Sequence, residues 1–337
     1  MFIVLFSSRT KIVSLLLLAT VICAFFFKDH LTTCYTRHFH GVRSEVTFLG
    51  QELGGLTRDE VETIVAAKIG AWQTEPIDAH YEPSFNSIVP ELWGYEIDIE
   101  ETVDSIMSAP RAKQIAPVLK PLLPDVSMQD YPSAFIERGN PQKESVALMI
   151  NVAWGTEHLR PMLKVLAAGD ARATFFVVGR WAEQNEALLQ EISRQGHLIA
   201  NHGYSDAVVF PELTVERMEH SIGETNKIVR VATGQEPEYF TPHKGEYNEL
   251  VLETISRQGM RTIMWSIDTV DWQEPGVEEM KARVLGNLHT GAIILAHPTA
   301  ETVTLFKEII PVINDKGFKL VTVDELLSPQ HLPDEIR

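Results

Sequence analysis

Short apolar runs and stretches of amphipathic helical spacing alternate regularly over residues 146–327. Short apolar runs typical of buried strands begin at Val146, Ala173, Leu198, Tyr239, Thr262, Ala292 and Lys319. Between them, apolar residues recur at the three- and four-residue spacing of amphipathic helices, as in residues 181–195 and in the helix that Thr214 caps. This alternation predicts an α/β fold with a parallel sheet or an incomplete barrel.

Residues 41–124 predict a small α+β unit. A short strand is expected over Val46–Leu49, and Thr57 caps a helix that runs on to Ile69. Further along, Ile88–Tyr95 alternates like a strand, and Asp98 begins a second amphipathic helix.

Residues 125–145 carry no apolar period and contain several turn-forming residues. They predict a linker between the small unit and the C-terminal domain, so that residues 41–327 fold as two units.

A basic cluster and an apolar run occupy the first 30 residues. Arg9 and Lys11 precede the uncharged stretch Ile12–Phe27, which is slightly shorter than the ~20 residues of a usual spanning helix. No small-residue cleavage site follows, so an uncleaved signal anchor is favoured over a cleaved signal peptide. Positive charge before the run predicts a single-pass protein of the cell membrane with its C-terminal domains outside.

Charge and cysteine content narrow the classes of function. The 337 residues carry a formal net charge of −17, which disfavours nucleic acid as a partner because phosphate backbones are repelled. Two cysteines exclude a disulfide-rich scaffold and a zinc module with four cysteine ligands.

Polar and titratable residues gather where the predicted strands end. In chain order they are Asn151, His202, Asp206, Thr241, His243, Lys244, Asp268, Asp271, Trp272 and His297. The carboxyl ends of parallel strands meet on one side of such folds, so these side chains are expected to converge. The i, i+4 pair His202 and Asp206 can place a nitrogen and an oxygen on one divalent ion.

Residues 146–327 resemble the NodB-homology domain of polysaccharide deacetylases, carbohydrate esterase family four. The matching stretches are Ala173–Gly179, Gly196–His202, Trp265–Trp272, Gly291–Leu295 and Val321–Leu327. The resemblance implies a distorted (β/α)7 barrel that hydrolyses the amide or ester of acetylated chitin-like or peptidoglycan sugars. It also implies a zinc-type ion that activates water and stabilises the oxyanion.

The family's first motif is replaced in this chain. The family places two aspartates there, a general base and a metal ligand, and the alignment puts Asn151 and Val152 at these positions. An amide cannot take the proton, which costs roughly 10²–10⁴ in rate. Valine offers no lone pair to a metal.

The other motifs are partly kept. Among the ligand positions, His202 is present, and Asp206 replaces the second histidine and can still ligate. The arginine of motif three is replaced by Thr241, and His243 and Lys244 follow it. His243 is a candidate substitute ligand, so that a zinc ion would be held by His202, Asp206 and His243.

The acid half of the catalytic pattern is intact. Asp271, Trp272 and His297, the family's general acid, match the motifs, and Trp272, Lys244 and Thr241 are assigned to substrate binding by the resemblance. The resulting hypothesis is a weak or inactive deacetylase acting on N-acetylated cell-wall glycan. The alternatives are a non-catalytic glycan-binding or scaffold protein of the cell wall or spore envelope, and a hydrolase of small sugars or amides. The spore-envelope role is an expectation from similarly altered branches of the family, found in sporulating bacteria.

The small unit shows a second, looser resemblance. The stretch Gly50–Thr57 followed by a helix, and later Gly94–Asp98, is similar to a peptidoglycan-binding repeat of bacterial envelope proteins. A spacer domain without a ligand is the alternative.

Overall fold

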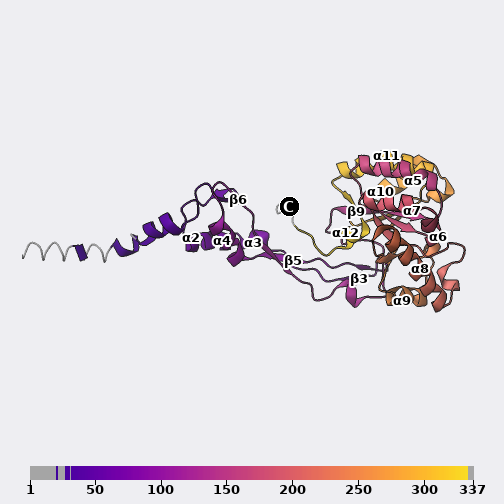
Figure 1. Ribbon diagram of the computed structural model, residues 1–337, viewed down its shortest axis with the longest axis horizontal. Helices are drawn as coiled ribbons and strands as arrows, with labels where there is room; N and C mark the ends of the chain where they lie inside the picture. Colours follow the sequence, from indigo (N-terminus) through magenta and orange to yellow (C-terminus); the bar gives the residue numbers. More distant parts are fainter. Residues whose placement is uncertain (1–19, 22–26, 31, 333–337) are drawn as a thin grey trace, which may run out of the picture. The chain divides into compact units, whose positions relative to one another are not determined.

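The computed structural model describes residues 20–21, 27–30 and 32–332 (Figure 1). Contacts divide the described residues into two compact units: one contains those up to residue 75 and residues 94–122, and the other contains residues 76–93 and 123–331. Most of the predicted signal anchor lies outside the described residues. Within the described part of the chain, no helix is both long enough and apolar enough to span a bilayer.

The first unit is a small α+β structure. Its elements are β1 (Thr47–Phe48), β2 (Gln51–Glu52), α2 (Arg58–Ala66), α3 (Ile69–Trp72), β5 (Gly94–Ile97), α4 (Ile99–Ser108), β6 (Gln114–Ile115) and β7 (Leu119–Leu122). Helices α2 and α4 begin at the predicted residues: the Thr57 backbone N–H donates to the Glu60 carboxylate, and Asp98 accepts from the Glu101 N–H at 3.0 Å. Helix α2 ends earlier than expected, at Ala66, and Ile69 starts a separate short helix.

The predicted strand over Ile88–Tyr95 is divided between the units. Its first part is β4 (Ser87–Val89), which pairs with β3 (His80–Glu82) in the larger unit, and its last part is β5 in the smaller one. The chain passes from one unit to the other between residues 93 and 94, inside the predicted strand. Alternating polarity alone does not reveal such a boundary.

The predicted linker is also different in the structure. Residues 125–145 belong to the larger unit and contain a 3₁₀ turn (Met128–Asp130) and the strand β8 (Phe135–Ile136), which pairs with β13. Ile136 is fully buried, and the Arg261 guanidinium donates to the Met128 carbonyl at 2.6 Å. A strand of two residues is too short to show a period, which is why the sequence suggested a linker.

The larger unit is built on one curled parallel sheet. Its strands follow the order β14-β15-β9-β10-β11-β12-β13-β8, with β16 pairing β9, and every pair in the sheet is parallel. The strands are β9 (Ser145–Val152), β10 (Ala173–Val177), β11 (Leu198–Asn201), β12 (Tyr239–Phe240), β13 (Arg261–Ile263), β14 (Ile267–Asp268), β15 (Ile293–Ala296) and β16 (Lys319–Val321). All seven predicted strands are present, and the α/β class is confirmed. The sheet is a curled half-barrel, more open than the (β/α)7 barrel expected.

Helices cover this sheet (Figure 1). They are α5 (Thr156–Ala168), α6 (Gly179–Gln184), α7 (Glu186–Arg194), α8 (Val215–Thr233), α9 (Glu249–Arg257), α10 (Val277–Gly286), α11 (Ala300–Asp315) and α12 (Val323–Leu327). The helix predicted over residues 181–195 is split at Asn185 into α6 and α7. Thr214 precedes α8 as predicted.

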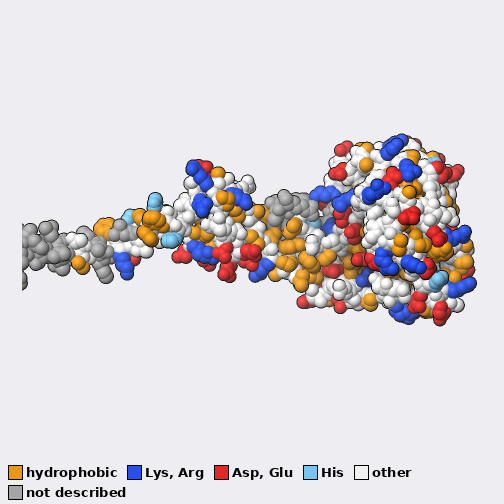
Figure 2. All heavy atoms as spheres, viewed as in Figure 1, with side chains coloured by type: hydrophobic (Ala, Val, Ile, Leu, Met, Phe, Trp, Pro, Cys, Tyr) orange, Lys and Arg blue, Asp and Glu red, His pale blue; other side chains and the backbone are white. Residues whose placement is uncertain are grey.

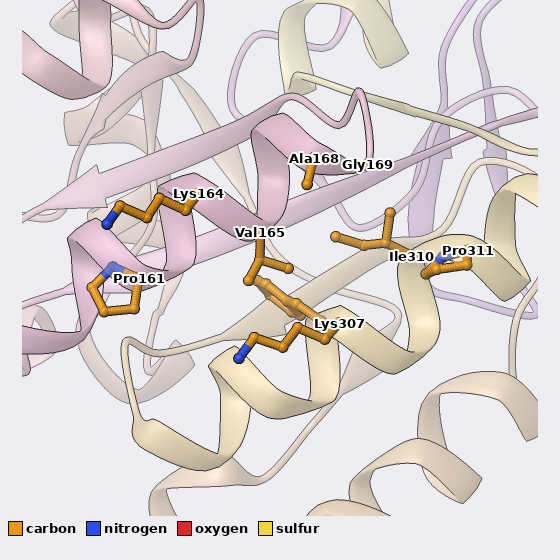
Figure 3. A pocket seen from close by; sticks show the side chains of 9 residues that line it. Pro161, Lys164, Val165, Ala168, Gly169, Lys307, Ile310 and Pro311 are labelled. Atoms are coloured by element: carbon orange, nitrogen blue, oxygen red, sulfur yellow. The ribbon is translucent and has the colours of Figure 1, made fainter.

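A shallow apolar hollow of about 490 Å³ lies between α5 and α11, where Val165 and Ile310 form part of its floor and the amines of Lys164 and Lys307 lie at one end (Figure 3). It lies between two helices that cover the sheet. On the visible face of the larger unit, acidic and basic side chains are interspersed (Figure 2).

Strand β9 alternates between two apolar clusters. Its even-numbered residues Val146, Leu148, Ile150 and Val152 belong to the cluster that also contains residues of α5 and α11. Its odd-numbered residues Ala147 and Met149 belong to the cluster that contains residues of α12. Because strand side chains point alternately to opposite faces, Asn151 continues the face of Met149, and Val152 continues the helix-covered face.

Candidate functional site

A pocket of about 480 Å³ opens at the carboxyl ends of the strands. It is lined by Asn151, Ala153, Trp154, His202, Asp206, His243, Lys244, Trp265, Asp268, Trp272, Leu295 and His297. Eight of the ten residues that the sequence places at the strand ends line it. Asp271 and Thr241 do not line it; both are fully buried. The convergence expected for parallel strand ends is therefore present in the structure.

The carboxylate of Asp271 holds His297 in place. Nδ1 of His297 donates to Oδ1 of Asp271 at 2.7 Å, and Oδ2 accepts from the His297 backbone N–H at 2.6 Å and from the Thr302 hydroxyl at 2.7 Å. With both oxygens engaged and no exposed surface, Asp271 orients the imidazole and cannot itself serve as a base for a ligand in the pocket. Nε2 of His297 is left to face a ligand.

The end of β9 has no acid or base. Asn151 lines the pocket and is 6 % exposed, and its side-chain oxygen has no hydrogen-bond partner among the described residues. Val152 is fully buried in the helix-facing apolar cluster. This part of the pocket can donate or accept hydrogen bonds but cannot take up a proton.

Two buried imidazoles form the wall next to Asn151. Nδ1 of His202 bonds to the Thr241 carbonyl oxygen at 2.7 Å, and the His202 and His243 rings lie 4.3 Å apart. Burial lowers the pKa of His243 to about 4, against the raising effect of Asp206, and burial together with the neighbouring His243 holds the pKa of His202 well below its usual value. Both rings are therefore neutral at neutral pH.

Gly203 makes this arrangement possible. It has a φ of +73°, and a Cβ there would lie 2.9 Å from Nε2 of His243. That nitrogen is buried and has no hydrogen-bond partner among the described residues. Thr241 contributes through its carbonyl behind His202, which differs from the substrate-binding position expected for its side chain.

The donor set does not fit the zinc site that the family implies. His202, Asp206 and His243 line one pocket, but within the described ranges no group of three or more His, Cys, Asp or Glu side chains is placed to hold a metal ion. A catalytic zinc needs three protein ligands and a water, and the ligand position at Val152 carries an apolar side chain. No step of the chemistry considered below is assigned to a metal.

Three tryptophans line the pocket: Trp272, which the sequence assigned to substrate binding, Trp265, which served there only as a framework residue, and Trp154, which the sequence reasoning missed. Trp154 is 46 % exposed and Trp272 is 56 % exposed, and Trp265 also lines the pocket. The Trp154 ring is parallel to that of His297, with an angle of 6° and centroids 5.8 Å apart. A signal for Trp154 was available, because this large aromatic residue lies only two positions beyond the end of the first strand of the larger parallel sheet.

Two residues in the loops beside the pocket have a left-handed backbone conformation. Lys244 has a φ of +57° and Val270 also has a φ of +57°, a conformation that is unusual for a β-branched residue. The Val270 N–H donates to the Asp268 carboxylate at 2.8 Å, which compensates part of the cost and holds Asp268 at the pocket wall. Strained residues of this kind cluster at functional sites.

Comparison with known proteins identifies the class. The family model of polysaccharide deacetylases matches residues 138–263. The uncharacterized protein YlxY of Bacillus subtilis is 33 % identical over 276 residues, which is 82 % of this chain and 86 % of that protein. A peptidoglycan-N-acetylglucosamine deacetylase of Bacillus cereus is 30 % identical over 204 residues, 59 % of this chain and 73 % of that protein.

A solved structure of the same family is similar to this chain in fold as well as in sequence. BA3943 of Bacillus anthracis, described as a CE4 family pseudoenzyme, is 28 % identical with a TM-score of 0.68, covering 80 % of this chain and 95 % of its own. A mutant of BA3943 with restored enzymatic activity has the same TM-score and identity. The chain belongs to the polysaccharide deacetylase family, carbohydrate esterase family four.

Proposed function

We propose that this chain binds N-acetylated cell-wall glycan in the pocket and deacetylates it weakly or not at all. The observation that carries the proposal is the end of β9, where an amide and a buried valine lie at the positions of base and metal ligand. The rest of the pocket has aromatic walls and a histidine that Asp271 orients.

The kind of ligand follows from the lining and from the relatives. The pocket combines aromatic faces with hydrogen-bonding groups of both types, which suits a sugar with hydroxyls and an N-acetyl group. The Bacillus cereus relative is named for its action on N-acetylglucosamine of peptidoglycan, and other relatives are chitooligosaccharide deacetylases. These names support an N-acetylated glycan as the ligand of this chain.

A non-catalytic role is the second candidate, and the burial of Val152 favours it. Its side chain belongs to the apolar cluster under α5 and α11, so this position is used for packing. The protein would then retain the glycan-binding pocket as a scaffold component of the wall or spore envelope.

The test measures binding and turnover on the same sample. The full-length protein is titrated with chitotetraose by calorimetry, and acetate release from chitotetraose and from N-acetylated peptidoglycan is followed in parallel. Binding with little or no acetate release is expected. Turnover comparable to that of intact deacetylases would show that another base operates. The variant Asp268→Asn would then show whether that base is Asp268, a carboxylate that lines the pocket. Absence of any glycan binding would contradict the proposal.

We also propose that the larger unit acts outside the cell. The support is the basic cluster Arg9 and Lys11 before the apolar run Ile12–Phe27, together with the wall-directed activities of the relatives. A reporter active only in the cytoplasm, fused after Arg337, is expected to stay silent, and a strong signal would overturn this topology. The small unit would bring the larger one to peptidoglycan or serve as a spacer.

A further inference from the structure

The indole of Trp154 is a solvent-open part of the pocket wall. Trp154 follows the end of β9 by two residues and lines the pocket while remaining 46 % exposed. Its ring lies parallel to the His297 imidazole, with centroids 5.8 Å apart. An indole supported by another ring and still open to solvent is available to a second flat partner.

The position of this ring is built into the backbone on both sides. Beneath it, His297 is fixed by its two bonds to the Asp271 carboxylate, one from the ring and one from the backbone. Behind it, Gly155 has a φ of +72°, and a Cβ there would lie 2.1 Å from the Pro298 carbonyl oxygen. The turn that carries Trp154 therefore packs tightly against the segment that carries His297. A side chain ordered in advance loses little entropy when a ligand binds.

The chemistry of this surface suits a pyranose. One face of a β-linked N-acetylhexosamine ring consists of C–H groups, which pack favourably on the electron-rich face of an indole. The hydroxyls and the acetamido group at the edge of the sugar need hydrogen-bond partners. Asn151, His243 and Lys244 line the same pocket, and the Asn151 side-chain oxygen and His243 Nε2 are buried without partners among the described residues.

We propose that Trp154 is the stacking platform of a glycan subsite that accepts one N-acetylhexosamine unit, with His297 supporting the platform from below. The inference rests on the proposed function and extends it by assigning recognition to a residue at the altered first motif. The same strand end that cannot take up a proton thereby supplies a binding surface.

The test is calorimetric titration of the full-length protein with chitotetraose. Trp154→Phe keeps a flat aromatic face and is expected to bind within about threefold of the wild type. Trp154→Leu keeps apolar volume without a π face, and Trp154→Ala removes both; each is expected to weaken binding at least about tenfold, as for an aromatic anchor of an interface. Tyr81→Ala is the matched control, because Tyr81 is 50 % exposed and does not line the pocket, and it is expected to bind like the wild type.

The outcomes separate the platform from the proposed function. Wild-type binding that Trp154→Leu and Trp154→Ala leave unchanged overturns the platform and leaves glycan binding standing. No binding by the wild type overturns both. As a second measurement that needs no truncation, the indole N–H resonance of Trp154, assigned by its loss in Trp154→Phe, is expected to shift during the titration. An unshifted resonance in a protein that binds chitotetraose also overturns the platform.

Discussion

The two sides of the pocket have diverged. On one side, His297 is held by the buried Asp271 carboxylate, which also accepts from the Thr302 hydroxyl. On the other side, β9 ends in Asn151, whose side-chain oxygen lacks a partner in the described part of the chain, and in Val152, which is packed into the core.

The difference shows that loss of catalytic groups need not disturb the framework that carried them. The Asp271–His297 pair is retained, and it also supports Trp154. Because an aspartate at position 151 without the arginine that the family places at position 241 would be an uncompensated charge, the two replacements are physically coupled. Asn151 at the pocket wall and the buried Thr241 behind it are both neutral, so neither replacement leaves an unpaired charge.

The largest expected effect comes from restoring the altered side. The triple variant Asn151→Asp, Val152→Asp and Thr241→Arg is expected to raise acetate release from chitotetraose at least about 100-fold in the presence of zinc, because it restores a base. Adding His297→Ala to this variant supplies the control and should abolish the gain. No gain in a folded triple variant would show that the framework has also changed.

Stability should separate the two neighbouring positions of β9. Val152→Asp places a carboxylate in a fully buried apolar site and is expected to lower the free energy of unfolding by about 3 kcal/mol. Asn151→Asp, at the pocket wall, should cost no more than about 1 kcal/mol. Thermal or urea unfolding of the two variants checks this. Equal losses would contradict the assignment of the two side chains to opposite faces of the strand.

The zinc content of the purified protein tests whether the pocket has enough ligands to hold a metal ion. The wild-type protein, purified without chelators, is expected to hold well below one zinc per chain, because no trio of ligands is present among the described residues. Near-stoichiometric zinc in the wild type that is lost in both His202→Ala and His243→Ala would instead establish the substituted ligand set predicted from the sequence.

The two histidines on either side of β11 differ in their relation to the site. His202 follows the strand and lines the pocket, whereas His197 precedes it and accepts from the Ala173 N–H at 3.2 Å. Burial lowers the pKa of His197 to about 4.

Between pH 6.5 and 4 the unfolded chain binds a proton at His197 that the folded chain does not, so stability falls as the pH falls. The loss due to this residue reaches at most about 3 kcal/mol at pH 4. His197→Gln, which keeps an acceptor for Ala173, is expected to flatten this part of the profile of unfolding free energy against pH. An unchanged slope would show that other groups are responsible.

Local sequence patterns determined much of this protein. The strands and helices of the larger unit follow from apolar runs and amphipathic spacing, because burial on a parallel sheet demands them. Caps such as Thr57 and Asp98 mark helix starts because they satisfy free N–H groups within one turn. The expectation that His202, His243 and His297 share a pocket also came from the sequence, through the rule that parallel strands end on one side.

Only the tertiary structure decided the rest. Two-residue strands such as β8 and β14 carry no period, so their place in the sheet depends on long-range pairing. Whether residues 76–93 belong to the small or the larger unit, and whether residues 125–145 are free or packed, depends on contacts between distant segments.

The same reason applies to the site. The stacking of Trp154 on His297 and the saturation of both Asp271 oxygens join residues far apart in the chain, and no local pattern contains such information. Sequence order alone identified the residues that could take part in chemistry. Their distances, their burial and their hydrogen bonds, which determine what that chemistry is, exist only in the folded chain.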